Sequence, residues 1–286
     1  MRADQRARRD GFLSKLGVHP LVMGILNVTP DSFSDGGRFL AADAAVAHAK
    51  AMAAQGCAII DIGGESTRPG ATPVPEVDEL ERIGTVVVQL ANELAVPLSV
   101  DTYKASVAAR AVDLGAILIN DVWGLQKDPG MADTVAAAEA AVVIMHNRSE
   151  KDAGLDVVAD LRRFFDRSLA LAARAGIAER FILLDPGIGF GKTARQNIDA
   201  IARLGELTDY GRPIMIGTSR KKFFGSLIPA GLERGTESHL IGTIAVSLAA
   251  AAAGASLFRV HDVAEHVAAL AVFAALRKRG PGAPAG

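Results

Sequence analysis

The chain has 286 residues, half of them hydrophobic, and a formal net charge of −1. It is long enough to bury a large core, and its balanced charge argues against a nucleic-acid-binding protein that relies on a general electrostatic field. The single cysteine, Cys57, excludes an internal disulfide and fits a reducing, cytoplasmic compartment. Residues 1–10 are rich in arginine and no apolar core follows them, so no secretory signal is expected.

The chain begins with residues 1–20, for which we expect an irregular N-terminal segment. From residue 21 onward, short apolar runs typical of buried strands alternate with alanine-rich helical stretches. The predicted strands are residues 21–28, 58–62, 97–100, 117–120, 141–145, 181–184, 213–216 and 256–260. Predicted helices include residues 41–55, 76–94, 105–114, 157–175 and 197–207.

This alternation predicts a single-domain (β/α)8 TIM barrel over residues 21–278. A doubly wound open sheet is the alternative, although it usually needs fewer strands and no GxGxxG motif follows the first strand. The window 241–255 is too short and too weakly apolar to span a membrane, so it predicts a buried helix. Residues 279–286 predict a disordered tail.

Polar residues stand at the C-terminal ends of the predicted strands, where a barrel builds its active sites. Any one of them could be a helix cap or a turn residue. Caps do not, however, require arginine, histidine and asparagine in the final strand residues, so the set predicts a polar site. Its members are Asn27, Asp61, Asp101, Asn120, Asp121, His146, Asp185, Ser219, Arg259 and His261.

Four stretches at these ends have composition suited to ligand binding. Residues 61–70, DIGGESTRPG, contain paired glycines and place a hydroxyl beside a guanidinium. Residues 185–192, DPGIGFGK, form a glycine-rich turn whose spacing differs from that of a Walker loop. Residues 217–222, GTSRKK, and residues 259–262, RVHD, follow or end the last two strands.

Together with MGILNVTPDSFSDGG, SVDT and IND, these motifs resemble the dihydropteroate synthase family of the folate pathway, in matching order across residues 21–275. The family is a (β/α)8 barrel, often a homodimer, and a target of sulfonamides. It transfers a pterinylmethyl group from 6-hydroxymethyl-7,8-dihydropterin diphosphate to 4-aminobenzoate, with Mg²⁺, and releases diphosphate. The resemblance implies these two small-molecule substrates, Mg²⁺ as cofactor, and neither nucleic acid nor membrane as partner.

The resemblance assigns a pterin site to Asp101, Asn120, Met145, Asp185 and Lys221. A dihydropterin carries a 2-amino group beside a ring N–H, and the Asp185 carboxylate can accept both. Asp101 and Asn120 complete this edge, and Lys221 reaches the acceptor atoms of the ring. Asp61 is interpreted as a structural residue outside the site.

The diphosphate is assigned to Asn27, Arg68, Arg259 and His261. The first and last strands are neighbours in a closed barrel, so Asn27 is expected close to Arg259 and His261. By resemblance, Asn27 also helps to hold Mg²⁺, since an amide oxygen with phosphates and waters is a usual environment for that ion. Asn27, Arg259, His261 and Lys221 are the residues expected to be catalytic.

The 4-aminobenzoate site is assigned to residues of the loops above the barrel, and Phe190 among them could equally be a packing residue. These residues are Phe33, Thr67, Arg68, Pro69, Phe190 and Ser219. The implied reaction is a dissociative substitution in which the leaving group is stabilised and the neutral arylamine needs no strong base. This agrees with a sequence in which we find no Ser-His-Asp or Cys-His arrangement.

Three other functions compete with this interpretation. A pterin-binding methyltransferase acting on a methylated reduced folate would share Asp101, Asn120 and Asp185 but would not need Arg68, Arg259 and His261. A Schiff-base aldolase could use Lys221, although such a lysine is better placed inside a strand. A non-catalytic pterin-binding protein would not need to retain the leaving-group residues.

Overall fold

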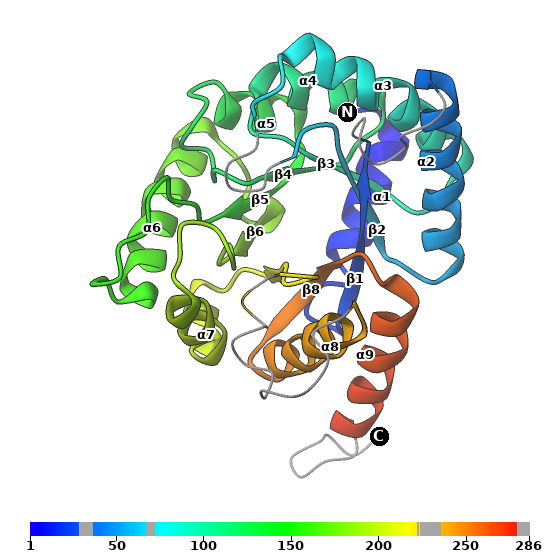
Figure 1. The fold of residues 1–286 in the computed structure, drawn as a ribbon. Helices are drawn as coiled ribbons and strands as arrows, with labels where there is room; N and C mark the ends of the chain where they lie inside the picture. The colour runs from blue at the N-terminus through cyan, green and yellow to red at the C-terminus, as the bar shows by residue number, and fades with distance from the viewer. Residues whose placement is uncertain (29–36, 67–71, 222, 224–235, 279–286) are drawn as a thin grey trace.

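Eight parallel strands pair in sequence order and close into a barrel, with β1 next to β8. The computed structural model describes residues 1–28, 37–66, 72–221, 223 and 236–278. The strands are β1 Leu21–Asn27, β2 Ile59–Gly63, β3 Leu98–Asp101, β4 Leu118–Asp121, β5 Ala141–Met145, β6 Ile182–Asp185, β7 Ile214–Ile216 and β8 Ala255–Val260. The predicted barrel and its strands are therefore confirmed (Figure 1).

Helices surround the strands, as expected when both faces of each parallel strand are buried (Figure 1). They are α2 Gly37–Ala54, α3 Glu76–Glu93, α4 Ala105–Leu114, α5 Met131–Ala138, α6 Val157–Ala175, α7 Ala194–Ala202, α8 Thr236–Ala252 and α9 Val263–Arg277. Two short 3-10 helices, Glu179–Phe181 and Leu204–Tyr210, add to them. The barrel interior and the strand–helix layer form a continuous apolar core built largely of valine, isoleucine and leucine.

Helix α7 begins three residues earlier than predicted because of a capping box. The Thr193 hydroxyl accepts from the Gln196 amide N–H at 3.1 Å, and the Gln196 side chain accepts from the Thr193 N–H at 2.9 Å. This reciprocal pair satisfies two backbone donors at the helix start. It fixes where the chain leaves the glycine-rich loop after β6.

The N-terminal segment is not irregular as predicted, because Ala3–Leu13 form a helix, α1. Its buried residues, Gln5, Arg9 and Phe12, recur at the spacing of one helical face. Two of these three are polar, which hides the amphipathic pattern from a search for apolar residues. The Gln5 side chain donates to the carbonyls of Val112 at 2.7 Å and Ala116 at 3.3 Å.

Helix α1 covers the N-terminal end of the barrel, opposite the strand ends that carry the polar residues. The Arg9 guanidinium lies 3.8 Å from the Phe181 ring centroid and donates to the Glu139 carbonyl. Glu139 and Phe181 precede β5 and β6, so α1 contacts segments that lead into the N-terminal ends of these strands. The α1 segment is thus part of the folded unit.

Helix α8 is half-buried, whereas the sequence predicted a buried helix. Thr243 and Ser247 face the core and donate to the carbonyls of His239 and Thr243, while Ile241 is 61% exposed. Within the part of the chain that the structure describes, no helix is long and apolar enough to cross a membrane. The predicted disordered tail, residues 279–286, lies outside the described residues.

We expect Gln5→Ala to lower the free energy of unfolding by about 1–3 kcal/mol, because two buried carbonyls lose their donor. Denaturant unfolding measures this change. Gln89→Ala is the matched control, since the Gln89 side chain bonds to the exposed Glu93 side chain and to no buried group among the described residues. Equal stability of the two variants would show that the hydrogen bonds of Gln5 do not contribute to the barrel's stability.

Candidate active site

The predicted polar residues do converge inside the barrel. Arg259 of β8 spans the interior to reach β2 and β3: its Nε donates to Asp61 at 2.6 Å and its Nη2 donates to Asp101 at 2.8 Å. Both carboxylates are buried. Arg259 was predicted to contact the diphosphate, which stays a prediction; the structure shows that two of its nitrogens bond to carboxylates.

Asp61 was interpreted as structural, but it lies within this cluster of site residues. Its side chain is fully buried and accepts from Ser99 at 2.6 Å, Asn120 at 2.9 Å and Arg259. The sequence signal was present, since Asp61 follows the same apolar-run pattern as Asp101 and Asp185. The pattern alone did not show which partners it would meet.

Two acceptor atoms in this cluster are buried without a hydrogen-bond partner among the described residues: Asp101 Oδ1 and Asn120 Oδ1. Leaving a buried acceptor unpaired costs roughly 1–3 kcal/mol, so a folded protein keeps such atoms only for a reason. Burial raises the pKa of Asp101 to about 8, a rise opposed by Arg259 and increased by Asp61, and N–H donors from a ligand would favour the charged form that accepts hydrogen bonds. These atoms are suited to a ligand that supplies N–H donors.

Asp185, at the end of β6, is buried beside them. Its Oδ1 accepts from the Gly187 N–H at 2.6 Å, and burial raises the pKa of the Asp185 carboxyl against the effect of that bond. Gly187 has φ of 63°, and a Cβ there would lie 1.9 Å from the His146 carbonyl oxygen. Only glycine can therefore make the turn that presents this N–H. The neighbouring Met145, predicted to line the same pocket, is buried and pairs with Asp185 in the β5–β6 register.

Lys221 and Phe190 are brought together, although the sequence assigned them to different substrates. The Lys221 Nζ lies 4.3 Å from the Phe190 ring centroid and donates to the Ile188 carbonyl. Burial lowers the pKa of Lys221 to about 8, with Asp185 acting in the opposite direction. The lysine thus sits between the buried carboxylates and an aromatic ring.

A second lysine, Lys192, was missed by the sequence analysis. Its Nζ contacts His146 Nδ1 at 2.7 Å, the Gly187 carbonyl at 3.0 Å and the Phe190 carbonyl at 3.2 Å. An ammonium group has three donors, so these three acceptors match it. His146 Nε2 in turn contacts Asp160 at 3.2 Å. Lys192 therefore holds the loop after β6 on the end of β5.

Ser219 and His261 lie next to each other at the ends of β7 and β8. Their side chains are 2.9 Å apart, between Oγ and Nδ1, and Ser219 Oγ also accepts from the His261 N–H at 3.1 Å. The sequence assigned Ser219 to one substrate and His261 to another. These two residues, predicted for different substrates, are thus in direct contact.

Asn27 ends β1 and is partly buried, with its Oδ1 3.8 Å from where a Gly63 Cβ would lie. Among the described residues no group of three histidine, cysteine, aspartate or glutamate side chains could hold a metal ion. A single amide oxygen suits an ion that is held mainly by substrate phosphates and water. Four predicted site residues lie outside the described residues: Phe33, Thr67, Arg68 and Pro69.

The segment that follows β2 is anchored by a buried ion cluster, which the sequence did not reveal. Lys104 Nζ contacts Glu65 Oε2 at 2.6 Å, the Val74 carbonyl at 2.6 Å and Glu79 Oε2 at 2.5 Å. Glu65 also accepts from the Val74 N–H at 3.1 Å and from Tyr103 at 2.8 Å. These contacts hold residues 65 and 74 close to each other.

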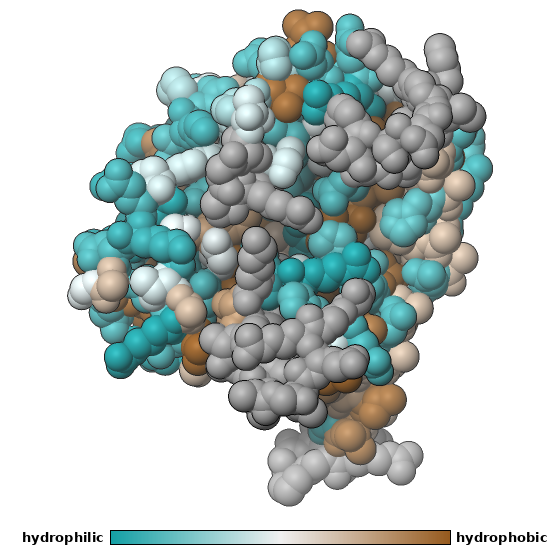
Figure 2. Space-filling model, viewed as in Figure 1, coloured by the Kyte–Doolittle hydropathy of each residue, from teal (hydrophilic) through white to brown (hydrophobic). Residues whose placement is uncertain are grey.

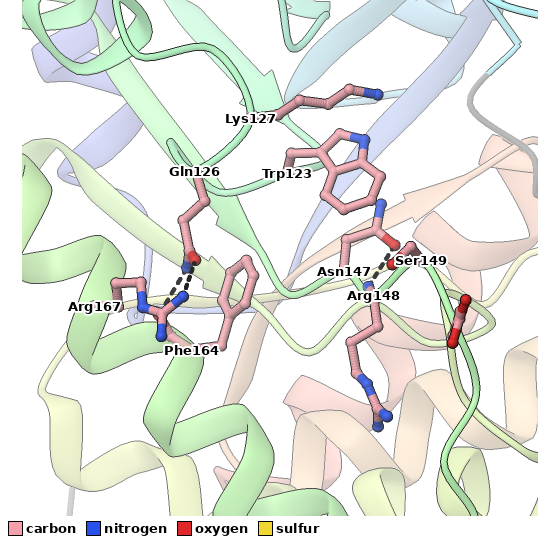
Figure 3. A pocket seen from close by; sticks show the side chains of 9 residues that line it. Trp123, Gln126, Lys127, Asn147, Arg148, Ser149, Phe164 and Arg167 are labelled. Carbon is pink, nitrogen blue, oxygen red and sulfur yellow. Dashed lines mark hydrogen bonds between the residues drawn. The ribbon is translucent and has the colours of Figure 1, made fainter.

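A pocket of about 590 Å³ lies beside the ends of β4 and β5, outside the acceptor cluster (Figure 3). It is lined by Trp123, Gln126, Lys127, Asn147, Arg148, Ser149, Glu150, Phe164 and Arg167. In Figure 3, Arg167 turns toward Gln126, and the Trp123 ring lies near Asn147. None of these lining residues belongs to the predicted site.

The face seen in Figure 2 is largely hydrophilic.

Comparisons with known proteins agree with this geometry. A family profile described as "Pterin binding enzyme" matches residues 23–261. Dihydropteroate synthase from Bacillus subtilis is 47% identical over 243 residues, which cover 85% of this chain and 84% of that protein.

Two solved structures are similar over nearly the whole chain. The first, dihydropteroate synthase from Clostridium difficile in the presence of pteroic acid, is 46% identical, with a TM-score of 0.87 and coverage of 91% of this chain and 98% of that one. The second, from Xanthomonas albilineans with 4-aminobenzoic acid, is 47% identical, with a TM-score of 0.86 and coverage of 91% and 94%.

We expect Lys192→Met to destabilise the protein by roughly 1–3 kcal/mol, because three buried acceptors lose their donor. Denaturant unfolding measures the effect. Lys151→Met is the matched control, since Lys151 is exposed. A Lys192→Met variant as stable as this control would show that the lysine does not hold the loop.

Proposed function

The chain belongs to the dihydropteroate synthase family of pterin-binding enzymes, and on this premise we propose how its residues carry out the reaction. The enzyme joins 4-aminobenzoate to 6-hydroxymethyl-7,8-dihydropterin diphosphate, forming 7,8-dihydropteroate and releasing diphosphate. The sequence-based prediction of this function is confirmed, and the three competing functions are set aside.

The observation that supports our placement of the pterin is the pair of buried acceptors that have no partner within the described part of the chain, Asp101 Oδ1 and Asn120 Oδ1. With the Asp185 carboxylate they form an acceptor-lined floor, which suits the amino and ring N–H groups of a dihydropterin. Donors on the ring would remove the cost of leaving these atoms unpaired. Met145 would pack against the same ring.

Lys221 would donate to the acceptor atoms on the opposite edge of the ring. In the structure its Nζ donates to the Ile188 carbonyl, so the ring atoms would replace that partner. The contact between Lys221 and Phe190 supports a pterin edge that lies next to the aromatic residue proposed for 4-aminobenzoate. One lysine would thus contribute to both subsites.

The diphosphate would lie at the ends of β1 and β8, with Asn27, His261 and Arg68 as its contacts. Arg259 uses Nε and Nη2 on carboxylates, so its contribution to the anion would come from Nη1, for which no hydrogen bond is found within the described residues. Asn27 is the residue that would hold Mg²⁺ through its amide oxygen. When bound, this ion would supply charge stabilisation to the leaving diphosphate.

4-Aminobenzoate would bind between Phe190, Ser219 and the residues after β1 and β2. Phe33, Thr67, Arg68 and Pro69 are proposed here from their positions in the motifs. The contact between Ser219 and His261 supports this order, because the amine must attack the carbon that the diphosphate leaves. A subsite next to the leaving group meets that requirement.

In the proposed reaction, the bond between the methylene carbon and the diphosphate oxygen breaks, and its electron pair goes to the diphosphate. The electron-rich dihydropterin stabilises the resulting cation, while His261 and Arg259 stabilise the negative charge that develops on the oxygen. The arylamine nitrogen then bonds to the methylene carbon and loses one proton to water. No side chain has to act as a strong base.

A homodimer formed through α8 and α9 is proposed from the exposed apolar side chains on these helices. Ile241, Val272 and Leu276 are 61%, 61% and 68% exposed. Large apolar side chains that gather on neighbouring helices often mark an interface. We also propose a cytoplasmic location, which fits the single buried thiol, Cys57.

Incubation of the protein with the pterin diphosphate, 4-aminobenzoate and Mg²⁺, followed by an assay for dihydropteroate, tests the proposed function. Formation of dihydropteroate and diphosphate in equal amounts is the expected result. Binding of the pterin without product would favour a non-catalytic pterin-binding protein.

The pH profile tests the role of Lys221. Burial lowers the pKa of its ammonium to about 8, so the donor is charged below this pH and loses its charge above it. We expect kcat/KM for the pterin diphosphate to fall with a midpoint of about 8, because this parameter reports the free enzyme.

Lys221→Arg should abolish this alkaline limb, since a guanidinium stays protonated throughout the range. Lys127→Arg, at an exposed lysine, is the matched control and should keep the limb. An unchanged profile in Lys221→Arg would assign the titration to another group.

A further inference from the structure

Asp61 hydrogen-bonds to Asn120, a residue of the proposed pterin floor, and to Arg259, which in turn holds Asp101. Its carboxylate, fully buried on β2, accepts from Ser99 on β3, Asn120 on β4 and Arg259 on β8. Three strands are thus tied to one side chain. Neither the mechanism above nor the motif assignments give this residue a role.

The contact between Asp61 and Asn120 fixes which way the Asn120 amide faces. A carboxylate accepts hydrogen bonds and donates none, so the Asn120 atom 2.9 Å from Asp61 Oδ2 must be the NH₂ group. The amide oxygen is then left facing away from Asp61. This Oδ1 is one of the two buried acceptors without a partner among the described residues.

The other unpaired acceptor depends on Asp61 through Arg259. Asp61 holds the guanidinium by its Nε, and the same guanidinium donates by its Nη2 to Asp101 Oδ2 at 2.8 Å. One oxygen of Asp101 is thereby occupied, and Oδ1 is left over. Asp61 therefore controls both of these acceptors. It orients the Asn120 amide directly, and it acts on Asp101 through Arg259.

We propose that Asp61 is a positioning residue that sets the hydrogen-bonding polarity of the pterin floor. By engaging the Asn120 NH₂ group and the Arg259 Nε, it leaves only acceptors facing the ring and so selects a ring edge made of donors. The proposal rests on the proposed function, because it needs the pterin to lie on this floor. Asp61 itself does not touch the ligand.

Asp61→Asn tests this idea with little change in volume. An amide at position 61 can keep its oxygen on Asn120 and Arg259 only by turning its NH₂ group to the Ser99 hydroxyl, which can accept; in the other orientation the NH₂ group faces two donors, which is a conflict. The Asn120 amide can relieve this conflict by turning its oxygen toward residue 61, which would present NH₂ to the pterin. We expect the affinity for 6-hydroxymethyl-7,8-dihydropterin, measured by calorimetry, to fall at least tenfold.

The exchanged pair Asp61→Asn, Asn120→Asp separates this effect from a general structural role. The new amide can donate to the new carboxylate, whose second oxygen again faces the ring as an acceptor, although the same NH₂ group then also meets the Arg259 Nε. We expect the double variant to bind the pterin at least tenfold more tightly than Asp61→Asn alone. Its net charge equals that of the wild type, so a charge effect is controlled.

Two controls complete the experiment. Ser99→Ala removes one donor to Asp61 but leaves the contacts of Asn120 and Arg259, so pterin affinity should change less than threefold. In Asp61→Asn, thermal unfolding should remain cooperative, and the KM for 4-aminobenzoate should stay within twofold of the wild type. A comparable rise in both substrates' KM values would indicate loss of structure and would contradict the proposal.

The possible outcomes separate the inference from the function on which it rests. If the wild type does not bind the pterin, the proposed function fails. If the wild type binds and Asp61→Asn binds equally well, only the role of Asp61 is overturned. If the double variant binds no better than the single one, polarity at residue 120 is not what Asp61 controls.

Discussion

The site depends on one partly buried guanidinium held between two buried carboxylates, Arg259 with Asp61 and Asp101. Burying such charges is costly unless they are paired, and removing one partner of a buried pair typically costs about 3–5 kcal/mol. These three residues lie on β2, β3 and β8, so their ion pairs link three strands near the C-terminal end of the barrel. It also leaves Asp101 Oδ1 without a hydrogen-bond partner among the described residues. The ion pairs that stabilise the fold thus also leave an acceptor for a ligand.

The buried Lys192 and the partly buried Lys221 organise the loop after β6 in complementary ways. Lys192 engages the carbonyls of Gly187 and Phe190, while Lys221 engages the carbonyl of Ile188 between them. Burial lowers the pKa of Lys192 to about 7 and that of Lys221 to about 8. Lys192 has three acceptors and stays in the framework, whereas Lys221 has a single carbonyl acceptor among the described residues and has donors left for a ligand. Similar lysines thus differ in role because their partners differ.

Much of the fold and part of the site could be predicted from the sequence. Apolar runs that end in a polar residue located the strands and identified Asp101, Asn120 and Asp185 as inward-facing residues. The role of Asp61 could not be read in this way, because its partner Arg259 lies 198 positions away and only barrel closure joins them. Lys192 was missed because its acceptors are mostly backbone carbonyls. Every residue has such a carbonyl, so the sequence does not reveal which ones a lysine will meet. Helix α1 was missed because its buried face is partly polar.

The central claim is that buried acceptors at the strand ends recognise the donor edge of the pterin. It is tested most directly by calorimetric titration of the wild-type protein with 6-hydroxymethyl-7,8-dihydropterin and with its analogue lacking the 2-amino group. The account predicts that the analogue binds at least about 100-fold more weakly, because buried acceptors would be left without a donor. Equal affinity for the two ligands would contradict it.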